Sequence, residues 1–151
     1  MKTKIRLVEE SEITLLYEHL REFLDTPNAS TTGNSLPPFE DSEKFVKKYF
    51  FDNMNHEYDK WYMVLNEKDE IIGNVYITKK NMIAYHILNE YQRQGYGEES
   101  IELLMKENPR NKYFATVNVK NNGSINFIKK FGFIEKGYIF EKIIRDENNK
   151  P

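Results

Sequence analysis

The sequence has no cysteine, only a small excess of acidic over basic residues, and no long hydrophobic run. The lack of cysteine excludes disulfide bonds and a cysteine nucleophile, and it favours a cytoplasmic location. A formal net charge of −2 provides no basic field, so neither nucleic acid nor an anionic membrane is an expected partner. No apolar run reaches the length of a transmembrane helix, and residues 1–4 lead into a short predicted strand instead of the apolar core of a signal peptide.

The three histidines also lack the spacing of a metal site. His19, His56 and His86 fall on different predicted elements, and no two of them stand at ligand spacing. Metal catalysis is therefore not expected.

The length of 151 residues predicts a single domain with its own core. Hydrophobic periodicity and capping residues predict four helices, at residues 11–24, 41–54, 98–106 and 124–131. Runs of β-branched and aromatic residues predict strands at 5–8, 61–65, 71–78, 82–88 and 113–119, with one or two closing strands within 134–144. This order gives a mixed α/β sheet, and the charged tail at 145–151 is expected to be frayed.

The most informative stretch is residues 92–97, Gln-Arg-Gln-Gly-Tyr-Gly. It follows the predicted buried strand at 82–88 and opens the predicted helix at 98–106. A strand, a Gly-X-Gly turn and a helix start together form a concave set of backbone N–H groups at the positive end of the helix dipole, which suits a phosphate. Glycine serves here because a Cβ would hold the ligand away from the backbone.

Two common phosphate-binding loops do not match this stretch. The dinucleotide fingerprint needs a third glycine where Ser100 stands. The P-loop needs a glycine followed by lysine and then serine or threonine, and the chain has no such sequence. A nucleotide-binding domain of another kind and a tight turn without a ligand remain open at this point.

Two motifs in the right order resemble a known family. Gln92-X-X-Gly95-X-Gly97 resembles the Q/R-X-X-G-X-G/A signature of the GNAT superfamily of acyl-CoA-dependent N-acyltransferases. Residues 121–125 (Asn-Asn-Gly-Ser-Ile) and 130–133 (Lys-Phe-Gly-Phe) are similar to the family's Asn-X-X-Ser-Ile…Lys-Leu-Gly-Phe segment. The overall pattern is most similar to the ribosomal-protein-alanine and spermidine acetyltransferase branches. The resemblance implies the GNAT fold, an α/β domain with a mixed, mostly antiparallel central sheet flanked by about four helices.

By this resemblance the cofactor is acetyl-CoA. Backbone amides of the 92–97 loop would hold its pyrophosphate, Arg93 would add a charge-assisted contact, and the end of the preceding strand would pair with the pantetheine arm. Glu98 should point away, because its carboxylate repels an anion. Asn121 would contact the same arm or cap a helix, and Phe127 would lie near the cofactor or in the core. The expected cofactor-binding residues are Ile87, Leu88, Gln92, Arg93, Gln94, Gly95, Tyr96, Gly97, Glu98, Asn121 and Phe127.

The usual catalytic groups of the family are missing. Ile128 stands where many members carry a tyrosine, and Thr116 where many carry a glutamate. Ser124 and His86 are the candidate catalytic residues in their place. The resemblance puts the Ser124 hydroxyl near the thiol, and a histidine such as His86 has a pKa suited to a base at neutral pH. Helix capping by Ser124 and plain packing of His86 are the alternatives.

With weak acid and base groups, catalysis would depend on positioning and on a hydrogen bond to the carbonyl oxygen of the thioester. A backbone N–H at Ile87 or Leu88 is the expected donor. Tyr85 and Tyr138 are further candidate proton donors, while the acidic turn at 67–70 is expected only to connect two strands.

These features predict an N-acetyltransferase that moves an acetyl group from acetyl-CoA to a primary amine by direct attack in a ternary complex. The amine would be a peptide N-terminus, a polyamine, an amino sugar or another small amine, selected by the loop at 25–38, the second helix and the closing strands. The alternative is a catalytically silent GNAT-fold module that binds acyl-CoA as a sensor or partner-binding subunit, and the missing tyrosine and glutamate favour it. The resemblance allows a monomer or a homodimer.

Overall fold

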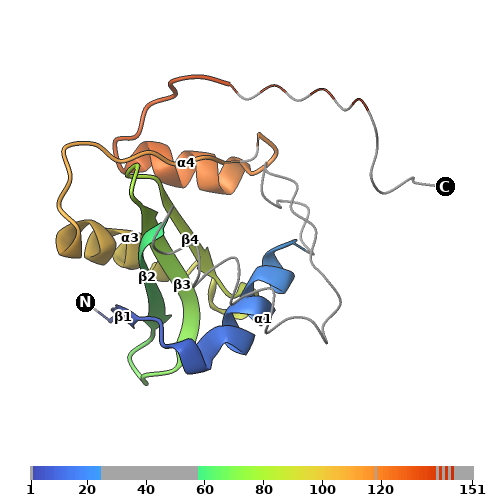
Figure 1. The fold of residues 1–151 in the computed structure, drawn as a ribbon. Coiled ribbons are helices and arrows are strands. Elements are labelled where there is room, and N and C mark those ends of the chain that lie inside the picture. The colour runs from blue at the N-terminus through green and yellow to red at the C-terminus, as the bar shows by residue number, and fades with distance from the viewer. Residues whose placement is uncertain are drawn as a thin grey trace.

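The computed structural model describes residues 2–24, 58–117 and 119–138, together with residues 140, 142 and 144. Over these ranges the chain forms an open antiparallel sheet in the order β1-β2-β3-β4 (Figure 1). The strands are β1 (Lys4–Leu7), β2 (Tyr58–Leu65), β3 (Ile71–Thr78) and β4 (Ile83–Ile87). The helices are α1 (Ile13–Leu24), α3 (Tyr96–Glu107) and α4 (Asn122–Lys130), with 3-10 turns η1 (Glu10–Glu12) and η5 (Asn89–Tyr91). None of the described helices is long and apolar enough to cross a membrane.

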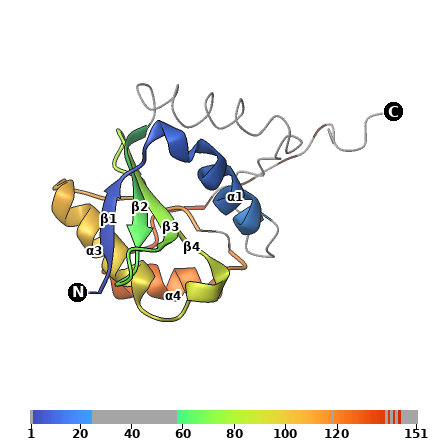
Figure 2. The same ribbon diagram turned by 90° about the horizontal axis from the view of Figure 1, so that it is seen from below.

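The sheet separates two layers of helix (Figure 2). α1 packs on one side, which we call the α1 face, while α3 and α4 cover the other side, the α3 face. Successive side chains in a strand point to opposite sides, so Tyr62 and Val64 of β2 face α3 while their neighbours face α1. The α1 face buries a cluster of apolar side chains from α1 and β2: Leu16, Tyr17, Trp61, Met63 and Leu65.

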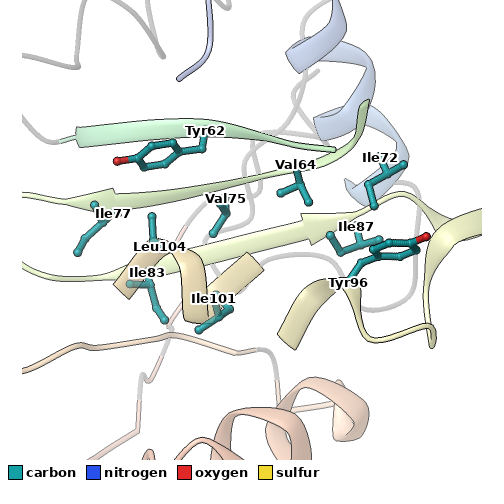
Figure 3. Packing of buried hydrophobic residues seen from close by; sticks show 10 residues of the cluster. All are labelled: Tyr62, Val64, Ile72, Val75, Ile77, Ile83, Ile87, Tyr96, Ile101 and Leu104. Atoms are coloured by element: carbon teal, nitrogen blue, oxygen red, sulfur yellow. The ribbon is translucent and has the colours of Figure 1, made fainter. Parts of the chain in front are cut away.

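The α3 face carries the larger of the two described cores (Figure 3). Ile101 and Leu104 stand three positions apart in α3 and are fully buried, so α3 presents one apolar stripe to the sheet. The side chains that complete this core come from three strands and the start of α3: Tyr62, Val64, Ile72, Val75, Ile77, Ile83, Ile87 and Tyr96. This packing fixes the start of α3 beside the end of β4.

The expected α/β architecture with a mostly antiparallel sheet is confirmed, and the predicted strands up to 82–88 correspond to β1–β4. The predicted helices at 11–24, 98–106 and 124–131 correspond to α1, α3 and α4. The predicted loop at 25–38, the predicted helix at 41–54 and the tail at 145–151 lie outside the described residues.

Among the described residues of the strand predicted at 113–119, the prediction is wrong except at one residue. Phe114 forms an isolated parallel bridge with Met82, and the described residues around it are not in a strand. The polar residues that follow, including the exposed Lys120, do not extend the ladder within the described ranges. A strand requires continued pairing with a neighbour, and local composition alone does not supply it.

The closing strands predicted within 134–144 are also wrong for the described residues of that segment, none of which is in a strand. Ile134, Tyr138 and Phe140 are largely exposed instead. Alternating apolar residues give a local preference for extended backbone, but a ladder forms only against a partner edge. A neighbouring segment with a single bridge offers no such edge.

Candidate active site

β4 is hydrogen-bonded to β3 along one side, and its other side is the outer edge of the sheet. His86 pairs with Asn74 in the antiparallel register, and Leu88 N donates to a carbonyl of β3 at 2.9 Å. Every second residue of such a ladder directs its N–H and C=O groups to the neighbouring strand, so these groups of His86 and Leu88 point to β3. The N–H and C=O groups of Tyr85 and Ile87 point to the outer edge of the sheet. The expectation that Leu88 offers its N–H to a ligand is therefore wrong, because that N–H is engaged within the sheet.

The outer edge of β4 is paired only where the strand begins. Ile83 N donates to Phe114 O at 2.7 Å, and Met82 forms its parallel bridge with the same residue. Within the described ranges no further bridge follows along β4, so the edge is unpaired at Tyr85, and at Ile87 the carbonyl accepts a hydrogen bond from the Gln92 side chain. Outward backbone groups on an open strand edge can bind an extended ligand as an added strand.

The 92–97 loop joins the end of β4 to α3 through two left-handed residues. Arg93 has a φ of 62° and Gly95 a φ of 87°, and α3 begins at Tyr96. When left-handed residues alternate with residues of negative φ, successive backbone N–H groups point to the same concave side of the loop. In this loop that side lies next to the positive end of the α3 dipole. The left-handed conformation costs a non-glycine residue about 1 kcal/mol or more, so the surrounding structure imposes this shape on Arg93.

The two glycines of the loop serve different purposes. A Cβ at Gly95 would meet no atom within 4 Å, so glycine is required there for its positive φ and not for space. A Cβ at Gly97 would lie 3.5 Å from the Tyr85 ring and 3.8 Å from the Ile87 side chain. A Cβ at Gly97 would therefore make ordinary van der Waals contact with the end of β4, and only a larger side chain would crowd the space between them.

Neighbouring side chains hold the loop in place. Gln92 Nε2 donates to Ile87 O at 2.8 Å and to Asn89 Oδ1 at 3.2 Å, so the motif glutamine ties the loop to the end of β4. The buried Tyr96 donates its hydroxyl to Glu67 Oε2 at 2.8 Å. The acidic turn between β2 and β3 thus supports the loop as well as connecting two strands.

A hollow of about 500 Å³ lies beside the first turns of α3. Its lining is rich in carboxylates and comprises Lys2, Gln94, Gly95, Glu98, Glu99 and Glu102. Glu99 already accepts a hydrogen bond from Thr3 N at 3.0 Å. Three carboxylates oppose a phosphate in this hollow, and Glu98 shares it with Gly95 instead of lying apart from the loop.

On the α3 face, Tyr85 points to the start of α4. Its hydroxyl lies 3.2 Å from Ser124 Oγ, and its ring centroid lies 5.0 Å from that of Phe127. Burial raises the pKa of Tyr85, so the hydroxyl keeps its proton at neutral pH. Ser124 is not the helix cap, because Asn121 Oδ1 fills that position by accepting a hydrogen bond from Ser124 N at 3.1 Å. The Ser124 hydroxyl is left to contact Tyr85.

The other residues considered as donors stand apart from this pair. Tyr138 is 73% exposed and its ring contacts that of Phe140. Ile128, at the family's tyrosine position, is buried in the hydrophobic core, and Thr116, at the glutamate position, is exposed. The structure therefore brings Tyr85 and Ser124 together and leaves Tyr138 out.

His86 lies on the other side of β4, on the α1 face. Its Nε2 lies 3.3 Å from Glu22 Oε2, and its ring centroid lies 6.5 Å from that of His19. Burial lowers the pKa of both histidines to about 4, so both rings are neutral at pH 7. The pKa near neutrality that the sequence suggested for His86 is wrong, because the sequence did not reveal how deeply the ring is buried.

Asn74 of β3 extends this polar group. Trp61 Nε1 donates to Asn74 Oδ1 at 3.1 Å, and Asn74 Nδ2 lies 3.0 Å from His19 Nδ1. Sequence reasoning did not select Asn74, His19 or Glu22 as site residues. One signal was present: His19 and Glu22 stand three positions apart in α1, so two polar residues share one face of an amphipathic helix.

A family model for the acetyltransferase (GNAT) family matches residues 16–133, most of the chain. The chain belongs to the GNAT acetyltransferase family. This match confirms the resemblance carried by the 92–97 loop and the 121–133 segment. Acetyltransferases of this family use acetyl-CoA, so the expected cofactor is confirmed at the level of the family.

Solved structures of acetyltransferases share the fold. Spermidine N-acetyltransferase from Vibrio cholerae, in complex with CoA and spermine, matches with a TM-score of 0.72 and 18% identity, over 96% of this chain and 88% of that chain. A possible acetyltransferase from Clostridium difficile 630 matches with a TM-score of 0.66 and 14% identity, over 97% of this chain and 100% of that chain. RimL, a ribosomal L7/L12 alpha-N-protein acetyltransferase in complex with coenzyme A, matches with a TM-score of 0.64 and 20% identity, over 91% of this chain and 82% of that chain. A search of curated proteins found no match to this sequence.

Proposed function

We propose that this GNAT protein is an N-acetyltransferase that transfers an acetyl group from acetyl-CoA to a primary amine in a ternary complex. The observation that carries the proposal is the outer edge of β4, which is unpaired at Tyr85 within the described residues and leads through η5 to the 92–97 loop. An extended arm can lie along this edge while an anion lies at the loop. Acetyl-CoA has both parts, joined in that order.

The residues around the loop fit this cofactor. Backbone N–H groups of residues 93–97 would hold the pyrophosphate, and the exposed Arg93 supplies a cation. The phosphates would lie next to Gly97, because the hollow that Gly95 lines is also lined by three glutamates. The outward backbone of Tyr85 would pair with the pantetheine arm, whereas Ile87 O already accepts a hydrogen bond from Gln92. The bound thioester supplies the activated acetyl carbonyl.

The remaining candidate cofactor residues would act mainly through the shape of the site. The side chains of Gln92 and Tyr96 are engaged in holding the loop, so their contacts with a ligand would be made by backbone. Asn121 fixes the start of α4 as its cap, and Phe127 packs beside Tyr85. The outward N–H of Ile87 is the proposed donor to the carbonyl oxygen.

Tyr85 and Ser124 would supply the proton that the leaving sulfur takes up. Their hydroxyls lie 3.2 Å apart at the start of α4, and Tyr85 keeps its proton at neutral pH. Tyr85 on β4 would thereby take the place of the family's tyrosine, whose position on α4 is occupied here by Ile128. A thiolate is a good leaving group, so this donor needs to contribute only modestly.

His86 would accept the proton that the amine loses. The His86 side chain projects from β4 next to Tyr85 but on the α1 face, and its ring is neutral at pH 7. A neutral imidazole can receive a proton through a ring nitrogen, and a pKa of about 4 makes this ring a weak base. The two proton transfers would take place on opposite sides of one strand.

The acceptor is proposed as a primary amine, with two classes to test first. Two structural neighbours are a spermidine N-acetyltransferase in complex with CoA and spermine and an alpha-N-protein acetyltransferase. Polyamines and peptide N-termini are therefore the first amines to assay, followed by amino sugars.

The experiment that tests the proposal is calorimetric titration of the protein with acetyl-CoA, with ATP and NAD as controls, followed by an assay of thiol release over the amine panel. Binding of acetyl-CoA alone among the three, with amine-dependent thiol release, is the expected result. Tight binding without transfer to any amine and without thioester hydrolysis would instead indicate a silent acyl-CoA-binding module. Binding of ATP or NAD in place of acetyl-CoA would overturn the assignment of the loop.

A further inference from the structure

The residues that precede β1 are fastened to the 92–97 loop and to the first turns of α3. Thr3 is buried, and its N–H donates to Glu99 Oε2 at 3.0 Å while its hydroxyl donates to the same oxygen. Lys2 donates from its ammonium to Gln94 O in the loop. These contacts join positions 92 and 96 apart in the sequence, and none of them takes part in the acetyl transfer proposed above.

The ammonium of Lys2 is held in place by more than one contact. Its Nζ lies 4.3 Å from the centroid of the Tyr96 ring, as in a cation–π interaction. That ring is itself fixed, because Tyr96 is buried and its hydroxyl donates to Glu67 Oε2 at 2.8 Å. The hydrogen bonds of Thr3 anchor the backbone of the next residue. An exposed lysine is thus given one defined position beside the loop.

The contact with Lys2 sets the direction of the peptide unit between Gln94 and Gly95. This peptide is trans, and the C=O and N–H groups of a trans peptide point in opposite directions. Because Gln94 O is directed to Lys2, the N–H of Gly95 points away from Lys2. Lys2 lines the hollow beside α3 together with three glutamates, so this N–H is turned away from their carboxylates.

Glycine makes this peptide unit easy to reverse. A Cβ at Gly95 would meet no atom within 4 Å, and glycine adopts either sign of φ. Rotation of the unit would exchange its two polar groups, so that Gln94 O would face a bound phosphate and repel it. The loop therefore needs a contact that selects one orientation. Among the described residues, the ammonium of Lys2 is the group that holds this carbonyl.

We propose that Lys2 is a positioning residue for the phosphates of acetyl-CoA, which locks the peptide between Gln94 and Gly95 with its N–H toward the anion. The inference rests on the proposed binding of acetyl-CoA at the loop. A hydrogen bond to the carbonyl also polarises the N–H of the same peptide unit, which strengthens that donor. In addition, the ammonium lies among the carboxylates that line the hollow and offsets part of their charge.

The test uses Lys2→Met, which keeps a long unbranched side chain and removes the cation, and Lys2→Arg, which keeps a cation. Lys4→Met is the matched control, because it removes the same charge two positions away, where the ammonium contacts Asp69 instead of the loop. The probes are acetyl-CoA, inorganic pyrophosphate, and S-acetylpantetheine, which has the arm without the phosphates. NMR titration of the backbone amides of the full chain measures all three affinities, weak ones included, and reports on the Gly95 N–H directly.

Lys2→Met should weaken the binding of acetyl-CoA and of pyrophosphate about five-fold and leave that of S-acetylpantetheine unchanged. Lys2→Arg and Lys4→Met should bind all three probes as the wild type does. The shift of the Gly95 amide signal on addition of pyrophosphate should also shrink in Lys2→Met. Wild-type affinity for pyrophosphate in Lys2→Met, or an equal loss in Lys4→Met, would overturn the proposal. An equal loss for S-acetylpantetheine would do so too, because Lys2 would then support the whole site and not the phosphates.

The wild-type protein separates this role of Lys2 from the proposed function. Binding of pyrophosphate at the loop without binding of acetyl-CoA would overturn the proposed function, and the pyrophosphate affinities of the variants would still decide whether Lys2 orients the loop. A wild type that binds neither probe would overturn both proposals.

Discussion

Tyr85 and His86 are adjacent in β4, and their side chains engage opposite layers of the protein. The Tyr85 hydroxyl lies 3.2 Å from Ser124 on α4, while His86 Nε2 lies 3.3 Å from Glu22 on α1. The alternation of side chains in a strand produces this separation. The proposed proton donor and the proposed proton acceptor are therefore held apart, on opposite faces of the sheet.

Removal of the Tyr85 hydroxyl should slow acetyl transfer more than it weakens cofactor binding. We expect Tyr85→Phe to lower kcat about ten-fold, within the modest range for a general acid with a good leaving group, and to leave the Kd of acetyl-CoA nearly unchanged. Steady-state kinetics and calorimetry measure the two effects. Tyr138→Phe is the control, because that side chain is largely exposed and should be silent. A full rate in Tyr85→Phe would return Tyr85 to a packing role.

Replacement of Gly97 should abolish cofactor binding in a folded protein. Even the first side-chain carbon would lie 3.5 Å from the Tyr85 ring, so the branches of valine would fill the space between α3 and the open end of β4. Gly97→Val should lower the affinity for acetyl-CoA at least about 100-fold, because a side chain would hold the phosphates away from the loop backbone. Gly137→Ala, at an exposed position with no neighbouring atom within 4 Å of the added Cβ, is the control. Wild-type affinity in a folded Gly97→Val protein would remove the loop from the cofactor site.

Acidification should destabilise the fold through the two buried histidines. The pKa values of His19 and His86 are about 4 in the folded protein against 6.5 for an unperturbed histidine, so the unfolded chain binds more protons as the pH falls from 6.5 to 4. These two histidines should therefore leave the free energy of unfolding unchanged above pH 6.5 and lower it progressively between pH 6.5 and pH 4. The loss approaches about 3 kcal/mol for each histidine, as a shift of this size implies.

Urea unfolding at pH 7.5, 5.5 and 4.5 measures this loss. Because carboxylates also begin to titrate near the lower end, the decisive comparison is with His19→Gln, which should show a shallower fall in unfolding free energy over the same range. An unchanged slope in that variant would mean that His19 is not buried in its neutral form.

In the core on the α3 face, truncation of Leu104 should lower the free energy of unfolding more than truncation of its neighbour Leu103. This side chain is fully buried between α3 and the sheet, and Leu104→Ala should cost about 2–5 kcal/mol of unfolding free energy through lost burial and the remaining cavity. The adjacent Leu103 is only partly buried, so Leu103→Ala should cost less, about 1 kcal/mol. Chemical denaturation of both variants provides the measurement, and equal losses would contradict the orientation of α3 shown in Figure 3.

Much of the fold could be predicted because its signals are local. The apolar positions of α3 repeat at helical spacing, and β2, β3 and β4 are bounded by turn residues, so each element was predicted close to its observed position. The closing strands within 134–144 could not be predicted reliably in this way. Their alternating pattern allows extended backbone, but whether a ladder forms depends on a partner edge elsewhere in the chain.

The sequence by itself determined the position of the 92–97 loop, because Gly95 permits a left-handed turn and the residues around it encode the strand before and the helix after. The tertiary structure decided which groups gather beside that loop. Ser124 stands 39 positions from Tyr85, and Glu22 stands 64 positions from His86. Such contacts depend on the pairing register and on the faces to which α1 and α4 pack. No spacing along the chain encodes these, because they arise only when distant segments bury their apolar sides against the same sheet.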